Sequence, residues 1–279
     1  RVAMALLAES FVGALAGMTE VFCQQPTVAW KNAMQEGRPI PFAPRVMYRG
    51  VLVNAFSIAP CNATQFAVNS AASSLFRRLR GDPKAELSTA ERLAGAVTGG
   101  AMSALLATPA ELVMLQQQKH GGDLWGWFRR IYTEHGVGSA GLQRGLAAAA
   151  IRDSFYVGSY LGATPLLREH LQANYPVARD NPAVAKIASG LSAGLIAVVL
   201  SHPFDTVRTL QASELKTGPY HDKGLLDALA TAYKERGGLG GLYQGVVPRG
   251  MRVCGAVLII NEASERYRGL LGLAPPTSA

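Results

Sequence analysis

Long runs without charged residues alternate with short polar stretches along this chain. Three runs contain no Asp, Glu, Lys or Arg, namely 51–76, 93–110 and 187–204. Three further runs are apolar but carry two or three charges, namely 4–30, 145–167 and 246–263. Each run approaches or exceeds the ~20 residues that a helix needs to cross the hydrocarbon layer of a membrane. The pattern therefore predicts six membrane-spanning helices.

The composition agrees with a membrane protein. Of 279 residues, 49% are hydrophobic and only 16% are charged, whereas a soluble domain has about 25% charged residues. A large soluble all-helical protein with buried core helices is the alternative, because the mean hydropathy of +0.14 is only slightly positive. The chain begins at Arg1, so we expect any targeting segment to lie outside this sequence.

The net charge of +8 is concentrated in the polar stretches, such as 77–84, 129–130 and 234–236. Basic loops of this kind are typical of a membrane face with anionic lipid. The basic residues form no stripe with interleaved aromatic residues, so we expect no nucleic acid as a partner. Three cysteines, Cys23, Cys61 and Cys254, lie inside apolar runs. Their odd number favours small buried residues over a disulfide framework.

The chain contains three copies of one unit. Pro26, Pro109 and Pro203 stand near the ends of apolar runs, and each follows a pair of small residues spaced four apart. These pairs are Gly13 with Gly17, Ala96 with Gly100, and Gly190 with Gly194. Small residues at this spacing let two membrane helices approach closely. A proline is expected to bend each helix.

A second anchor recurs later in each copy, at Gly50, Gly145 and Gly245, directly before the second span. Amphipathic spacing over 123–134 and 222–235 predicts short helices lying on the membrane surface in copies two and three. Copy one has only Gly37 to Pro44 there, so its surface helix is shortened or absent. The copies are bounded as residues 1–84, 85–176 and 177–279, within one membrane domain.

The residues after each proline resemble those of the mitochondrial solute carrier family. Copy three, Pro203-Phe-Asp-Thr-Val-Arg208, matches the family's proline-x-acid-x-x-base signature in full, whereas copy one keeps the base and copy two keeps the acid. The resemblance covers essentially the whole chain. It implies a pseudo-threefold barrel of six tilted transmembrane helices in the mitochondrial inner membrane, with short matrix-side surface helices. It also implies a central cavity that opens alternately to either side.

In that family the acid of one copy pairs with the base of the next, which closes the matrix end. The resemblance therefore implies that Glu111 pairs with Arg208 and Asp205 with Lys31. The third contact joins Val28 and Met114, so both departures from the signature fall on one contact. Stranding one buried charge costs ~3–5 kcal/mol, whereas replacing both partners is often neutral. The alternative is that the two losses coincide by chance.

The cytosolic end of the family carries a second set of acid-x-x-base pairs. The matching positions are Ser70 and Ser73, Pro165 and Arg168, and Glu265 and Arg268. Each implied pair then lacks one member, which leaves Arg168, Glu265 and Arg268 as remnants of a cytosolic gate. Little would hold this end shut. A non-transporting role of the fold, as a structural subunit of a larger respiratory complex, is therefore the alternative function.

Substrate contacts are expected where the three copies differ, because a substrate is asymmetric. Arg152 and Asp153 lie within a span, where ionisable residues usually face a cavity or a partner. This segment resembles the fourth helix of amino-acid and acylcarnitine carriers, and Arg252 resembles their sixth-helix arginine. Glu20 shares the face of Lys31 and binds a cation or neutralises an arginine. The alternative is that Arg152 and Asp153 only satisfy one another.

Two glutamines and the three anchor glycines also have roles that the family resemblance implies. The resemblance implies that Gln35 and Gln118 brace the closed matrix end. It also implies that cardiolipin binds where Gly50, Gly145 and Gly245 precede helix starts with free backbone donors; a plain capping role is the alternative. No zinc spacing, catalytic triad or phosphate loop occurs, so we expect neither an enzyme nor a cofactor or metal. The sequence thus predicts a multi-pass exchanger of a small carboxylate-bearing metabolite, with zwitterions among the candidates.

Overall fold

The computed structural model describes residues 2–82 and 86–271, and it assigns no β-strand within them. The helices are α1 (Val2–Glu36), α2 (Pro44–Met47), α3 (Val51–Leu79), α4 (Thr89–His120), α5 (Leu124–His135), α6 (Leu146–Val157), the π-helix η1 (Gly158–Ala163), α7 (Thr164–Asn174), α8 (Pro176–Asp180), α9 (Pro182–Ser213), α10 (Leu225–Glu235), α11 (Leu239–Leu242) and α12 (Val246–Leu270). The expected all-α fold is confirmed.

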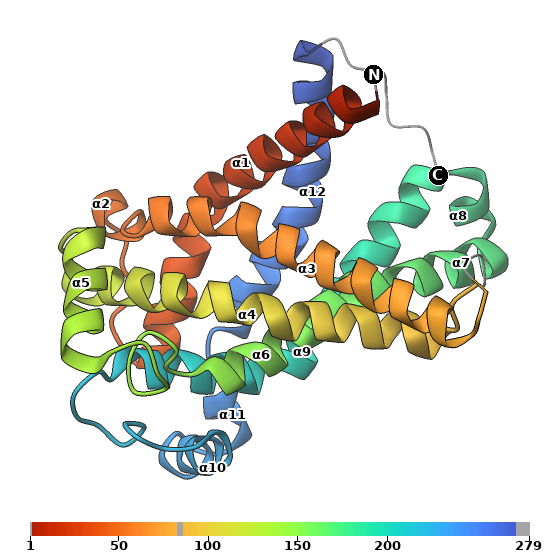
Figure 1. The fold of residues 1–279 in the computed structure, drawn as a ribbon. Helices are drawn as coiled ribbons and strands as arrows, with labels where there is room; N and C mark the ends of the chain where they lie inside the picture. The colour runs from red at the N-terminus through yellow and green to blue at the C-terminus, as the bar shows by residue number, and fades with distance from the viewer. Residues whose placement is uncertain (1, 83–85, 272–279) are drawn as a thin grey trace.

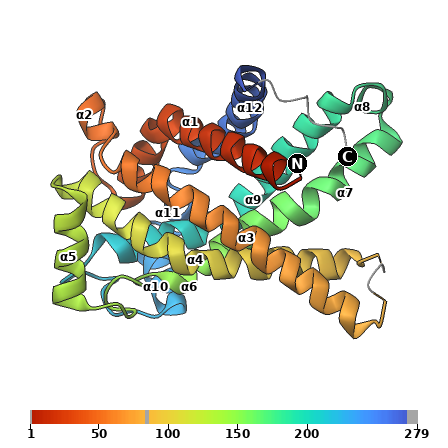
Figure 2. The same cartoon turned by 45° about the horizontal axis from the view of Figure 1, so that its top comes forward.

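The long helices form a closed ring (Figure 1). In order around the ring, α1 packs on α3, α3 on α4, α4 on α6, α6 and α7 on α9, α9 on α12, and α12 on α1. Counting α6, η1 and α7 as one segment, the described residues supply six spans. Figures 1 and 2 show three pairs diverging toward one end: α1 with α12, α3 with α4, and α7 with α9. The ring is therefore narrow at the proline-containing end and splayed at the other.

The anchor glycines show the threefold repetition at atomic detail. Gly50, Gly145 and Gly245 cap α3, α6 and α12 with φ of 75°, 76° and 82°, a conformation that costs other residues free energy. Each glycine also packs against the position of the signature base in the next copy. These contacts are Gly50 with Met114, Gly145 with Arg208, and Gly245 with Lys31. The same contact made three times closes the ring.

Within each copy the two spans cross at the small residues. A side chain at Gly17 would meet Ile58, one at Gly100 would meet the Asp153 backbone, and one at Gly194 would meet Val253. Ile58, Asp153 and Val253 all stand eight residues after their anchor glycine. The repeated small residues therefore mark one helix crossing per copy. The prolines lie within helices that continue past them, Pro26 in α1, Pro109 in α4 and Pro203 in α9.

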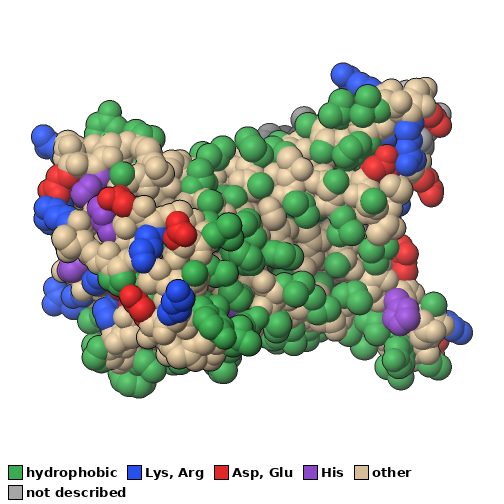
Figure 3. Space-filling view, turned by 90° about the horizontal axis from the view of Figure 1, so that it is seen from below, with side chains coloured by type: hydrophobic (Ala, Val, Ile, Leu, Met, Phe, Trp, Pro, Cys, Tyr) green, Lys and Arg blue, Asp and Glu red, His purple; other side chains and the backbone are tan. Residues whose placement is uncertain are grey.

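Membrane-spanning character is visible in the sequence and on the surface. In the described residues, three helical segments are long and apolar enough to cross a membrane, Pro44–Leu79, Thr89–His120 and Pro182–Ser213, one in each copy. The three partner spans carry six of the nine charged residues that line the central cavity, and α4 and α9 carry the other three. Figure 3 shows one face, on which charged side chains gather at the two ends and a band of hydrophobic side chains lies between them.

The surface elements follow the predicted asymmetry. The helices α5 and α10 occupy the predicted amphipathic stretches, and copy one has the four-residue α2 in their place. On α5, Ile131 is fully buried in a hydrophobic cluster beside α4, while Trp125 is exposed. One expectation was wrong: Cys23 is exposed, and Cys61 and Cys254 are half-buried. An apolar run in a membrane helix also has a lipid-facing side, so a cysteine within it need not be buried by protein.

Candidate functional site

Two ion pairs join neighbouring copies at the narrow end of the ring. Lys31 on α1 donates to Asp205 on α9 with an Nζ–Oδ2 distance of 2.9 Å. Arg208 on α9 lies 2.7 Å from Glu111 on α4, between Nη2 and Oε2, although its N–H is not aligned as a hydrogen bond. Both contacts are those that the sequence resemblance implied. Asp205 and Arg208 are each 2% exposed, so the pairs are shielded from water and weakly screened.

The third contact of the narrow end is apolar. Val28 and Met114 are 5% and 6% exposed and belong to one hydrophobic cluster. Beside them, Gln25 points its side-chain amide at the Met114 sulfur, at 3.9 Å. The two departures from the charge signature therefore lie together. Neither substitution leaves a stranded charge in this sector.

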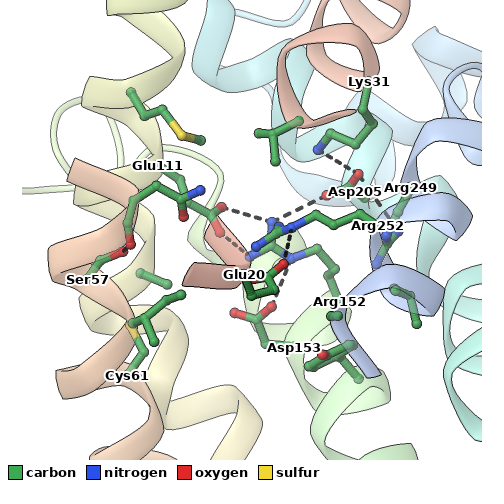
Figure 4. Close-up of a pocket in the computed structure, with 18 of the residues that line it drawn as sticks. Glu20, Lys31, Ser57, Cys61, Glu111, Arg152, Asp153, Asp205, Arg249 and Arg252 are labelled. Carbon is green, nitrogen blue, oxygen red and sulfur yellow. Dashed lines mark hydrogen bonds and ion pairs between the residues drawn. The ribbon is translucent and has the colours of Figure 1, made fainter. Parts of the chain in front are cut away.

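A cavity of about 270 Å³ lies next to the narrow end, and nine of its lining side chains are charged. Five are basic: Lys31, Arg152, Arg208, Arg249 and Arg252. Four are acidic: Glu20, Glu111, Asp153 and Asp205. The lining therefore carries a formal surplus of one positive charge. Figure 4 shows these groups, apart from Arg208, pointing toward one another from α1, α4, α6, α9 and α12.

Arg152 lies at the centre of this group. Its Nη1 and Nη2 donate to the two carboxylate oxygens of Glu111 at 2.8 and 3.0 Å, in the bidentate arrangement that arginine favours. The same Nη1 lies 3.3 Å from Asp205, and Nε donates to Asp153 at 2.8 Å (Figure 4). Arg152 and Asp153 thus contact one another and neighbouring helices, and their predicted contact with a substrate stays a prediction. Arg152 is 8% exposed.

Glu20 and Arg252 form a second pair across the α1–α12 interface. Arg252 Nε lies 3.3 Å from Glu20 Oε1, which also accepts a hydrogen bond from Gln24 at 2.9 Å. Of the two roles that the sequence left open for Glu20, the structure shows the one that neutralises an arginine. The Arg252 side chain remains 37% exposed while that of Glu20 is 5% exposed, so Arg252 is the member of the pair that solutes in the cavity can reach.

Arg249 is a cavity residue that the sequence prediction missed. Its carboxylate neighbour, Asp205, is 3.8 Å away and also contacts Lys31 and Arg152 at shorter distances. The Nη2 of Arg249 donates a hydrogen bond to the Ser201 hydroxyl at 2.7 Å. The signal was available, because the positions four residues after the other anchor glycines hold Asn54 and Ala149.

The wall opposite these arginines is polar but uncharged. Helix α3 contributes Asn54, Ser57, Cys61, Asn62 and Gln65 to the cavity lining. The Gln65 amide donates to Ser103 on α4 at 3.1 Å. The cavity therefore combines a charged side, suited to a carboxylate, with a side of hydrogen-bonding groups.

The comparisons with known proteins agree with this geometry. The family model described as mitochondrial carrier protein matches residues 85–175 and 179–272. The chain belongs to the mitochondrial carrier family. It is therefore a carrier and not an enzyme.

Several curated carriers are similar to this one. The mitochondrial carrier protein CoAc2 of Zea mays is 31% identical over 60% of this chain, and the match spans only 53% of that relative's length. The mitochondrial glycine transporter of Saccharomyces cerevisiae is 27% identical, with 81% of this chain and 76% of the relative covered. The mitochondrial 2-oxodicarboxylate carrier of Pongo abelii is 26% identical, with 76% and 72% covered.

Two glutamines support the narrow end of the carrier. Gln35 donates to Asp205 at 2.9 Å and accepts a hydrogen bond from Thr209 at 2.7 Å. Gln118 accepts a hydrogen bond from Asn32 at 2.6 Å, which links α4 to α1 near the apolar contact. In copy three, Gln211 donates to the Lys223 backbone instead. Gln35 and Gln118 are thus placed where the resemblance put the braces.

The splayed end holds the residues predicted as remnants of a cytosolic gate. Arg168 lies on α7, and Glu265 and Arg268 lie on α12. Near them the Tyr267 hydroxyl lies 2.7 Å from that of Thr19 on α1, which ties α12 to α1. The gating role of these three residues stays a prediction. No cluster of three or more His, Cys, Asp or Glu side chains able to hold a metal ion occurs in residues 2–82 and 86–271.

Proposed function

We propose that this carrier exchanges a small carboxylate-bearing metabolite across the mitochondrial inner membrane by alternating access. The observation that supports this most directly is the cavity lining, in which five basic side chains face four acidic ones. An enclosed surplus of positive charge attracts an anion more strongly than a cation. The ion pairs at the narrow end give the protein a side that is closed while the other is splayed.

The proposed substrate class follows from the chemistry of the two walls. A carboxylate fits Arg249 and Arg252, and the rest of the molecule would lie against the uncharged groups of α3. Glu20 would meet an ammonium group if the substrate is zwitterionic. The names of curated relatives support this substrate class. They include a glycine transporter, a citrate transporter and a 2-oxodicarboxylate carrier, and all of these compounds carry carboxylates.

Transport by reconstituted protein tests this proposal. Proteoliposomes are expected to take up at least one of labelled glycine, 2-oxoglutarate or citrate in a saturable manner that requires internal substrate. Arg249→Gln is expected to lower the initial uptake rate at least about tenfold, because a charge-assisted hydrogen bond contributes ~1.5–3 kcal/mol.

Arg266→Gln is the matched control. This arginine also lies on α12, but its side chain is 76% exposed and pairs with Glu262, so uptake should stay at the wild-type rate. Equal losses in both variants would contradict the assignment of Arg249. Absence of uptake for every labelled compound, together with stoichiometric co-purification with a respiratory complex, would instead favour a structural subunit.

We also propose cardiolipin as a bound lipid at the starts of α3, α6 and α12, which follow Gly50, Gly145 and Gly245. Free backbone N–H groups at helix starts suit phosphate. Cardiolipin added to the detergent-solubilised protein is expected to raise its unfolding temperature more than phosphatidylcholine at equal phosphate, since a ligand that binds only the folded state stabilises it. Equal shifts with both lipids would contradict specific binding.

A further inference from the structure

The narrow end of the ring contains one position for an acid and one for a base in each copy. Acids stand at Glu111 and Asp205, and bases at Lys31 and Arg208. The remaining base position is Met114, which packs in an apolar cluster. The ring positions alone therefore supply two ion pairs instead of three, and no charged contact joins copies one and two there through Val28 and Met114.

Arg152 adds a further cation to this ring from a different helix. It starts on α6, yet its guanidinium reaches Glu111 on α4 and Asp205 on α9 at 2.8 and 3.3 Å. Each of those acids already contacts one ring base, Arg208 or Lys31. One guanidinium thus connects the two separate ion pairs into a single network that includes α1, α4, α6 and α9.

The geometry requires arginine. Its three nitrogens contact three carboxylates at once, because Nε donates to Asp153 while the terminal nitrogens serve Glu111 and Asp205. A lysine ammonium is a point charge without this planar fork. The bridging contact belongs to copy two, since Ser57 stands at the equivalent place in copy one, and Arg252, its equivalent in copy three, pairs with Glu20 instead.

We propose that Arg152 is a third cation of the closed end, which compensates for the missing base at Met114 by bridging copies two and three and so holds the narrow end shut. It acts as a positioning residue that bridges Glu111 and Asp205. This inference goes beyond the proposed transport function and does not depend on which substrate the cavity accepts. Removing Arg152 leaves Glu111 with Arg208, and Asp205 with Lys31 and the more distant Arg249. No guanidinium then bridges the two acids, and the narrow end should open more readily.

Cys61 offers a built-in reporter, because it lines the cavity on α3. In a Cys23→Ser/Cys254→Ser background, a membrane-impermeant maleimide is added outside proteoliposomes that hold the protein in both orientations. Molecules with the splayed end outward should label quickly, and those with the narrow end outward slowly. No substrate is present, so the readout is independent of transport.

Arg152→Gln is expected to accelerate the slow phase of Cys61 labelling about tenfold or more. Each ~1.4 kcal/mol lost from the free energy that keeps the narrow end closed raises the population of the open state tenfold. Arg152→Lys should give a smaller acceleration, since it keeps the charge and loses the bridge. If Arg152→Gln does not reconstitute, Arg152→Lys alone supplies the comparison. The matched control is Arg266→Gln, which removes an exposed arginine whose ion pair is with Glu262 on the same helix and should leave the slow phase unchanged.

A rescue variant distinguishes weaker closure of the narrow end from a general destabilisation of the helix packing. Adding Val28→Asp and Met114→Lys to Arg152→Gln supplies the absent third ion pair, and the slow phase should return toward the wild-type rate. An unchanged slow phase in Arg152→Gln and Arg152→Lys would overturn the proposal. So would an equal acceleration in Arg266→Gln, because the effect would then not depend on Glu111 and Asp205.

Discussion

Replacement of Asp205 by asparagine should destabilise the carrier by about 3–5 kcal/mol, the usual cost of removing one partner of a buried ion pair. The carboxylate of Asp205 accepts from Lys31 and Gln35 at 2.9 Å each, and Arg152 and Arg249 lie at 3.3 and 3.8 Å. Asparagine keeps the volume but removes the negative charge. Three cations would then face one another in a site that is 2% exposed.

The measurement is the thermal unfolding of the detergent-solubilised protein, with uptake into proteoliposomes as a second readout. Asp153→Asn is the matched control. It is the same chemical change in the same cavity, but the structure pairs that carboxylate with Arg152 at the edge of the network. Asp205→Asn should therefore lower the unfolding temperature far more than Asp153→Asn. Similar shifts in both variants would contradict the central position of Asp205.

The second large effect is expected at the crossing of α4 and α6. A Cβ added at Gly100 would lie 2.4 Å from the Asp153 carbonyl oxygen and 2.8 Å from the Ser154 Cα. These are backbone atoms, so the two helices must move apart. Overpacking typically costs ~1–3 kcal/mol, and Gly100→Ala should reach or exceed the upper end because no flexible side chain can yield. The shift also displaces Arg152 from Glu111.

Gly13→Ala provides the comparison, because a Cβ there meets no atom within 4 Å. It belongs to the same small-residue pattern and also lies inside a helix. Alanine is favoured over glycine in a helix by ~1 kcal/mol, so this variant should unfold at or above the wild-type temperature. The unfolding temperature and the yield of folded protein, measured for both variants, show whether the added Cβ destabilises the crossing at Gly100 and not the helix at Gly13. A well-folded Gly100→Ala protein with normal stability would show that the crossing is looser than described.

Pseudo-symmetry explains why much of the narrow end could be predicted. Lys31, Asp205, Glu111 and Arg208 stand at repeated positions, so the register of the copies and the family resemblance together indicated their partners. The same register placed Val28 with Met114. It also located the anchor glycines, because a residue that must adopt a positive φ three times recurs as glycine three times.

The asymmetric residues could not be assigned in this way. Arg152 was predicted to face the cavity, and it does, but its contacts with Glu111 and Asp205 depend on how far a long side chain reaches from α6 between two other helices. Arg249 could have been recognised as a cavity residue, because Asn54 and Ala149 stand at the equivalent places, but not as a neighbour of Asp205. Its nearness to Asp205 exists only once α9 and α12 are packed.

The sequence by itself determined the all-α membrane character, the three copies and the repeated contacts, because each of these rests on spacing along the chain. Only the tertiary structure decided which cation each buried acid shares and which wall of the cavity is uncharged. Those outcomes depend on distances between helices that are far apart in sequence. A buried carboxylate takes whichever donors packing brings within ~3–4 Å, and residue spacing along the chain does not encode that distance.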